Sequence, residues 1–221
     1  YNLKIIEDNA ESIGGKYKGK KLGTIGDVST LSFYANKIIT TGEGGAILTN
    51  SRKIANKCLI LRDHGMSKIK KYLHLDLGYN YRITNMQAAI GLSQIEILNS
   101  ILKKKNNQLL TYRKYLSTIP EIKLRSFESW CSPVHWLTTI TLNKKNLRNK
   151  LLAYLKKFGI DARSMINPVH EAYHFKKYFK NKDFKNSIHV SKNSLHLPSS
   201  TNLKKKQIKF ICNKLIKFFN N

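Results

Sequence analysis

The sequence predicts an α/β fold in its first part and a smaller α+β domain in its second part. Before residue 118, β-branched and aromatic runs alternate with glycine-rich turns and with segments of helical periodicity. After Pro120 the pattern changes to short strands and amphipathic helices. We therefore expect an α/β piece over residues 1–118, including a long linking helix, and a small α+β domain over residues 119–221.

The first expected strand covers residues 3–6 and ends in Glu7 and Asp8. Acids at the carboxyl end of a strand point into the crevice where α/β proteins place their ligands. Residues 14–19 follow as a glycine-rich loop or hairpin. Further strands are expected over residues 28–34, 38–41 and 46–49, with a tight turn at residues 42–45 joining the last two.

Helical patterns separate these strands from the second part of the chain. Residues 51–62 predict one helix, and Thr84 with Gln87 forms a capping box that opens another. Apolar residues then recur at helical spacing, which predicts a single long helix running past residue 110. In the second part we expect strands over residues 122–125, 135–142 and 160–163, and helices over residues 146–158 and 202–219.

The charge of the chain is strongly positive. Lysine and arginine number 40 against 13 acids, which gives a formal net charge of +27. Such a charge suggests nucleic-acid binding, but the lysines are scattered along the whole chain. No aromatic residues interleave with the lysine runs as a single-strand stacking surface requires. We expect a surface that attracts anionic ligands, including nucleotides, and no dedicated nucleic-acid site.

Cysteine usage and hydropathy limit the class of protein further. The three cysteines form no CxxC pair, so neither a metal site nor a disulfide framework is expected, and a reducing, cytoplasmic location is the default. No apolar run is long enough for a transmembrane helix, and no signal peptide is recognisable. Because the chain opens with Tyr1 inside an expected strand, we expect a fragment whose amino-terminal part is missing.

Three side chains carry the chemical argument: Asp8, Ser32 and Lys37. Each lies at or just after the end of an expected strand. Pyridoxal phosphate (PLP) requires an amine for a Schiff base, a carboxylate for its pyridine nitrogen and hydroxyl donors for its phosphate. Taken singly, the lysine could be a solvated surface charge and the aspartate a turn former.

Two stretches resemble the DegT/DnrJ/EryC1/StrS family of sugar aminotransferases. The first is IIEDNAESIGGKYKGKKLGTIGDVSTLSFYANKIITTGEGGAILTN, and the second is GYNYRITNMQAAIGLSQIE. The resemblance is strong over residues 3–100 and looser at GIDARSMINPVH and LHLPSS. It implies PLP-dependent transferase fold type I, with a partial large domain that lacks its amino-terminal section, and usually a homodimer.

The resemblance assigns roles to four residues of the first stretch. Lys37 in SFYANK would form the Schiff base and shuttle a proton, and Asp8 would pair with the pyridinium nitrogen. Ser32 would bind the phosphate. Glu11 would lie near the phenolic oxygen of the cofactor, and we expect it to be protonated or hydrogen-bonded there. A glutamate at this position resembles the perosamine synthase branch of the family.

Three further residues are implied, Asn80 at the cofactor and Arg82 and His170 at the substrate side. Asn80 in GYNYR would reach the cofactor phosphate of a second copy, although it could also be a turn residue. Arg82 would support that loop or meet an anionic group, and a structural ion pair is the alternative. His170 in NPVH resembles a loop that borders the sugar site.

The implied reaction moves an amino group from glutamate to a nucleotide-linked 4-keto-6-deoxy sugar, with a GDP-linked sugar as the best match. The product would feed surface polysaccharide or lipopolysaccharide O-antigen assembly. One alternative stays open, in which the chain is a truncated, non-catalytic basic protein that binds nucleic acid or another polyanion.

Overall fold

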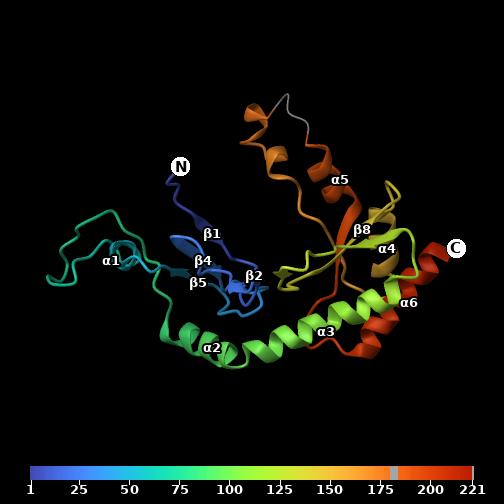
Figure 1. The fold of residues 1–221 in the computed structure, drawn as a ribbon, viewed down its shortest axis with the longest axis horizontal. Coiled ribbons are helices and arrows are strands. Elements are labelled where there is room, and N and C mark those ends of the chain that lie inside the picture. The colour runs from blue at the N-terminus through green and yellow to red at the C-terminus, as the bar shows by residue number, and fades with distance from the viewer. Residues whose placement is uncertain (180–183, 221) are drawn as a thin grey trace. The chain divides into compact units, whose positions relative to one another are not determined.

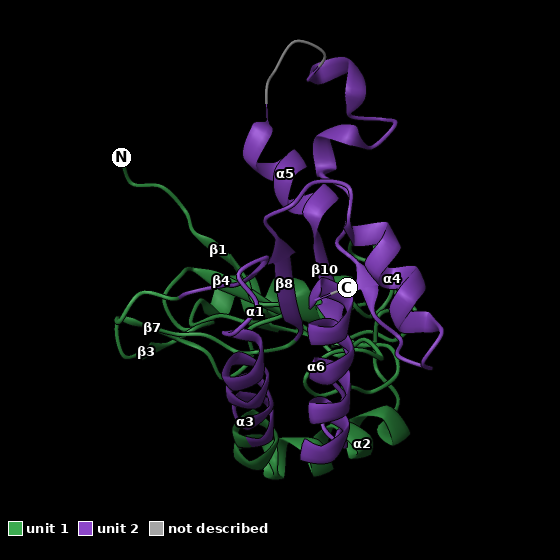
Figure 2. Cartoon of the chain, turned by 90° about the vertical axis from the view of Figure 1, so that its right-hand side faces the viewer, with its two compact units in different colours: residues 1–103, 127–136 green, residues 104–126, 137–221 purple. Residues whose placement is uncertain are grey.

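The computed structural model describes residues 1–179 and 184–220, and its chain divides into two compact units (Figures 1 and 2). Unit 1 comprises residues 1–103 and 127–136, and unit 2 comprises residues 104–126 and 137–221. The domain boundary that we expect at residue 118 remains a prediction. The segment 127–136 belongs to unit 1 although unit 2 residues flank it in the sequence.

Unit 1 is built on a three-stranded sheet with the order β1-β4-β5. Its strands are β1 (Ile6–Asp8), β4 (Val28–Ser32) and β5 (Gly45–Leu48). Strand β1 runs parallel to β4, and β5 runs antiparallel to it. The glycine-rich region forms the expected hairpin, whose strand β2 (Lys16–Tyr17) pairs with both β3 (Lys20–Lys21) and β7 (Cys131–Ser132).

The strand expected over residues 38–41 does not form. Strand β5 pairs with β4 instead, and the first strand begins at Ile6 rather than at residue 3. Ile38 and Ile39 are buried in a small core with Ile101. The side chain of Gln94 accepts from the Thr40 amide at 3.0 Å and donates to the Thr40 carbonyl at 2.7 Å. Because a side chain satisfies this backbone, the segment needs no strand partner.

Three helices follow, and the last two divide the expected long helix. Helix α1 (Arg52–Leu61) begins at Ser51, whose hydroxyl accepts from the Ile54 amide. Helix α2 (Asn85–Glu96) begins at the capping box of Thr84 and Gln87, which is confirmed. The single helix expected past residue 110 is wrong, since Ile97 leaves helical geometry with a ψ of 11° and separates α2 from α3 (Leu98–Leu116).

Unit 2 holds a four-stranded antiparallel sheet with the order β6-β8-β10-β9. Its strands are β6 (Ile122–Leu124), β8 (Thr138–Leu142), β9 (Arg163–Ser164) and β10 (Ser194–Leu197). The strand expected over residues 135–142 starts at Thr138, and the preceding Trp136 belongs to unit 1, where its indole N–H donates to the Asn36 carbonyl.

Helices complete unit 2 around one apolar core. They are α4 (Arg148–Lys156), α5 (Lys185–Asn193) and α6 (Lys205–Asn220), with short 3-10 turns η1 (Val169–Glu171) and η2 (Lys176–Tyr178). The core joins α3, α4 and α6 to the sheet through fully buried residues such as Tyr112, Leu151 and Leu215. None of the helices described in residues 1–179 and 184–220 is long and apolar enough to cross a membrane.

One polar stripe of α3 holds the loop after β10. Lys105 Nζ donates to the Ser199 carbonyl, Gln108 Nε2 donates to the Ser200 carbonyl at 2.6 Å, and the Tyr112 hydroxyl donates to the Pro198 carbonyl at 2.9 Å. These three residues share one face of α3 because they are three and four positions apart. Side chains of α3 thereby bind the last three backbone carbonyls of the LPSS segment.

Candidate active site

Strands β1 and β4 bring Asp8 and Ser32 to one edge of the sheet. The two strands are parallel, and Asp8 lies opposite Thr30. Because side chains alternate along a strand, Asp8, Thr30 and Ser32 point to the same face. The Asp8 carboxylate accepts from the Ala10 amide at 3.1 Å, and the Ser32 hydroxyl accepts from the Tyr34 amide at 3.3 Å. Each carries its polar group at the carboxyl end of its strand.

Lys37 follows β4 in a tight turn. Its amide donates to the Tyr34 carbonyl at 3.0 Å, and its side chain is only 14% exposed. The Nζ atom lies 3.2 Å from Oε1 of Glu11, whose own side chain is 54% exposed. The amine therefore has a carboxylate partner in this structure, and Glu11 accepts a hydrogen bond from it.

An indole ring forms the other side of the Lys37 environment. Nζ of Lys37 lies 4.2 Å from the ring centroid of Trp136. The Trp136 Nε1–H donates to the carbonyl of Asn36 at 2.6 Å, one residue before the lysine. The sequence does not predict a role for Trp136, because this residue is far from Lys37 in the chain and no local pattern links the two.

The loop over residues 23–26, which leads into β4, is anchored by Glu7. Its carboxylate accepts backbone N–H bonds from Gly23, Ile25 and Gly26 at 2.6–2.8 Å. Partial burial alone would raise the pKa of Glu7, but the backbone donors of Gly26, Gly23 and Ile25, with the amide of Asn9, together hold it below its ordinary value. The Glu7 carboxylate is thus a structural anion that shapes the loop.

Asn80 and Arg82 lie on an exposed ladder that continues from α1. The backbone of residues 61–66 pairs with that of residues 74–81, including a bridge between Asp63 and Asn80. Arg82 forms an ion pair with Asp63 at 3.1 Å, and its predicted contact with an anionic group remains a prediction. The side chain of Asn80 is exposed, and its predicted reach to a second copy remains a prediction.

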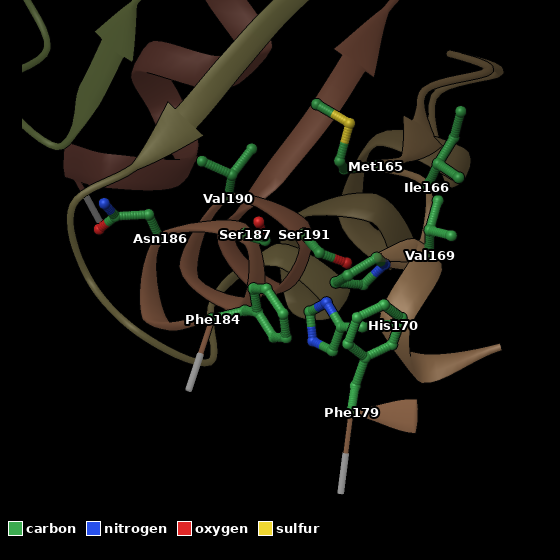
Figure 3. Close-up of a pocket in the computed structure, with 11 residues that line it drawn as sticks. Met165, Ile166, Val169, His170, Phe179, Phe184, Asn186, Ser187, Val190 and Ser191 are labelled. Carbon is green, nitrogen blue, oxygen red and sulfur yellow. The ribbon is translucent and has the colours of Figure 1, made fainter. Parts of the chain in front are cut away.

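His170 lies in unit 2, in turn η1. Its ring stacks on Phe184 with centroids 4.3 Å apart and an interplanar angle of 22° (Figure 3). The two rings border a mainly apolar cavity of about 630 Å³, which Met165, Val169 and Phe179 also line. Nε2 of His170 is buried and has no hydrogen-bond partner among the described residues. His170 belongs to unit 2, whereas Lys37 belongs to unit 1.

Comparison with known proteins gives one consistent result. The sequence profile of the DegT/DnrJ/EryC1/StrS aminotransferase family matches residues 1–216. GDP-perosamine synthase of Vibrio cholerae is 38% identical over 222 residues, which cover 100% of this chain and 60% of that protein. A UDP-4-amino-4,6-dideoxy-N-acetyl-beta-L-altrosamine transaminase of Campylobacter jejuni is 31% identical over 221 residues, which cover 96% of this chain and 57% of that protein.

Solved structures agree with the sequence comparison. Helicobacter pylori PseC, an aminotransferase involved in pseudoaminic acid biosynthesis, superposes with a TM-score of 0.91 at 27% identity. That match covers 99% of this chain and 60% of PseC. DesV of S. venezuelae gives a TM-score of 0.87 at 27% identity and covers 99% of this chain and 58% of DesV. The chain spans about 60% of the length of these relatives, and the expected fold type I is confirmed.

Proposed function

Because the chain belongs to the DegT/DnrJ/EryC1/StrS aminotransferase family, we propose that it contributes the lysine half of the active site of a PLP-dependent sugar aminotransferase. The surroundings of Lys37 support this proposal most directly, because its amine is largely shielded from solvent and lies beside a carboxylate at the edge of the sheet. The identity to GDP-perosamine synthases of V. cholerae and Escherichia coli O157:H7 favours a GDP-linked sugar as the acceptor.

The polar groups at this sheet edge suit the cofactor. PLP supplies an electron sink for amino-group transfer when it is bound. The Asp8 carboxylate would hold a proton on the ring nitrogen, and the Ser32 hydroxyl would donate to the phosphate. Asp8 and Ser32 lie on one face of adjacent strands, which supports their acting on one ligand. Lys37 would provide the amine for covalent attachment.

Glu11 would orient that amine. Its carboxylate lies 3.2 Å from Nζ of Lys37 and accepts a hydrogen bond from it. Lys37 would also move a proton to or from the substrate carbon as a general acid or base.

The substrate side of the proposal uses residues outside the Lys37 cluster. Arg82 and His170 would contact the nucleotide sugar, and Asn80 of a second copy would complete the phosphate site in a homodimer. Glutamate would be the amino donor and a 4-keto-6-deoxy sugar the acceptor. The product would enter surface polysaccharide assembly in the cytoplasm.

The test is covalent capture of PLP by the full chain. PLP is added, the absorbance is scanned, sodium borohydride fixes the adduct, and the modified peptide is mapped. We expect modification at Lys37, and its loss in Lys37→Arg and Lys37→Ala. The matched control is Lys18→Ala, which removes an exposed lysine of the same unit. Equal modification of Lys37 and of exposed lysines would contradict the proposal.

A further inference from the structure

Trp136 contacts the Lys37 region at two points. The face of its indole lies 4.2 Å from Nζ of Lys37, and its N–H donates at 2.6 Å to the carbonyl of Asn36. One ring therefore contacts both the reactive end of the lysine and the peptide group that precedes it. Few single side chains could set the position of this amine from two directions.

The indole is itself held in place by the rest of unit 1. Trp136 and Val134 pack against the small core of Ile38, Ile39 and Ile101. The segment that carries Trp136 is tied down by pairing of β7 with β2. These contacts hold the indole beside Lys37.

The electrostatics of the contact have a definite sign. The face of an indole attracts a cation, and the attraction grows when solvent is excluded, as it is for a lysine only 14% exposed. We infer that Trp136 is a positioning residue for Lys37, whose indole holds the charged amine against Glu11 while its N–H fixes the backbone of the turn. This inference rests on the proposed role of Lys37 in cofactor attachment.

The position of the Trp136 indole affects which molecules react with the Lys37 amine. The indole of Trp136 covers one side of Nζ of Lys37, so it limits the directions from which a reagent reaches the amine. It also directs the amine toward one place, so it increases selectivity for a ligand bound there. Loss of the ring is therefore expected to make Lys37 more reactive to small acylating reagents and less selective for PLP.

A spectroscopic signature tests the contact without any cofactor. In the full chain with isotope-labelled lysine, the ε-methylene signal of Lys37 is expected upfield because of the indole ring current. Lys37→Arg assigns the signal by removing it. The signal of Lys214, whose Nζ lies 3.6 Å from the ring centroid of Phe158 in unit 2, is the internal control. Absence of an upfield Lys37 signal in the wild-type chain overturns the inference, whatever the variants do.

Three variants separate positioning from packing. Trp136→Leu removes the ring and the N–H, and the upfield shift of Lys37 is expected to vanish. Trp136→Phe keeps a ring face, so most of the shift is expected to remain. Trp130→Phe changes the other tryptophan, which is exposed and packs edge-on against Tyr17 at 5.1 Å, and is expected to leave the signal unchanged. A shift that persists in Trp136→Leu contradicts the inference.

Acylation of Lys37 by acetic anhydride, measured by peptide mass spectrometry at fixed pH, gives the second readout. Loss of a cation–π contact predicts labelling about two- to fivefold faster in Trp136→Leu. Trp136→Phe is expected to restore a rate close to that of the wild type, and equal rates in all three chains overturn the inference. If wild-type Lys37 gives the shifted signal but no PLP adduct, the proposed function fails while the Trp136 contact stands.

Discussion

Replacing Lys105 by methionine is expected to remove a pH-dependent part of the stability of unit 2. Lys105 is buried, 6% exposed, and its Nζ donates to the Ser199 carbonyl. Burial lowers the pKa of this amine from 10.5 to about 8. Methionine keeps much of the unbranched side chain and has no group that titrates.

The sign and size follow from proton linkage. Below pH 8 the Lys105 amine is charged in both the folded and the unfolded chain, so the cost of burying the charge is present in full. As the pH rises toward 10.5, the folded chain releases the proton first, and the free energy of unfolding increases. At about 1.4 kcal/mol per pH unit, the free energy of unfolding increases by about 3 kcal/mol over the whole range between the two pKa values. Between pH 7.5 and pH 10 the gain is about 2 kcal/mol.

The assay compares urea unfolding of the full chain and of Lys105→Met by far-ultraviolet circular dichroism at pH 7.5 and pH 10. Other titrating groups are common to both chains, so the difference between their free energies isolates Lys105. We expect that difference to move by about 2 kcal/mol in favour of the wild type at the higher pH. Lys104→Met, which removes an exposed lysine next to it on α3, is the matched control.

A difference that is the same at both pH values would refute the reasoning, because it would mean that the Lys105 amine does not lose its proton earlier in the folded chain. A pH-dependent difference of the same size in Lys104→Met would refute it equally, since burial could then not be the cause.

Three further predictions concern unit 1 and the surface. Glu7→Gln turns an amide NH₂ toward backbone N–H donors. The free energy of unfolding, measured with urea at pH 7, is therefore expected to fall by about 1–3 kcal/mol. Because the pKa of Glu7 is lowered in the folded chain, this loss is expected to shrink as the pH falls below the usual range of a glutamate. Gly65→Ala sets a Cβ against the Asp76 carbonyl at a φ of +66°, so we expect more than about 2 kcal/mol of destabilisation in the same assay. Gly42→Ala, with a φ of +80° and open space, is the control and is expected to cost about 1 kcal/mol. Despite the charge of +27, no binding to an unrelated DNA duplex is expected near physiological salt in a fluorescence-anisotropy titration, and tight binding with a steep salt dependence would support the polyanion-binding alternative.

The parts of the fold that the sequence predicted correctly depend on neighbours in the chain. The capping box of Thr84 and Gln87 joins residues three positions apart, and both of its hydrogen bonds form. The family resemblance also rests on residues that are neighbours in the chain, in two continuous stretches, and it is confirmed. Local patterns carry their own physical cause, so a sequence can display them.

The expectations that were wrong, and the residue that was missed, depend on partners far away. The segment at residues 38–41 reads as a strand, but Gln94 takes its backbone groups. Helical periodicity continues across Ile97, so the pattern hides the break between α2 and α3. Trp136 is 100 positions from the carbonyl it binds, and no pattern of period two or 3.6 can connect such residues.

The two hydrogen bonds from the Gln94 side chain to the Thr40 backbone make the conformation of the segment after Lys37 depend on helix α2. The Thr40 amide has its bond to a side chain of α2, whereas amides of β4 and β5 have theirs to neighbouring strands. Solvent deuterium can replace the Thr40 proton whenever α2 frays or moves aside, even while the sheet stays closed. The exchange rate of this one amide therefore measures how often α2 releases the segment next to Lys37.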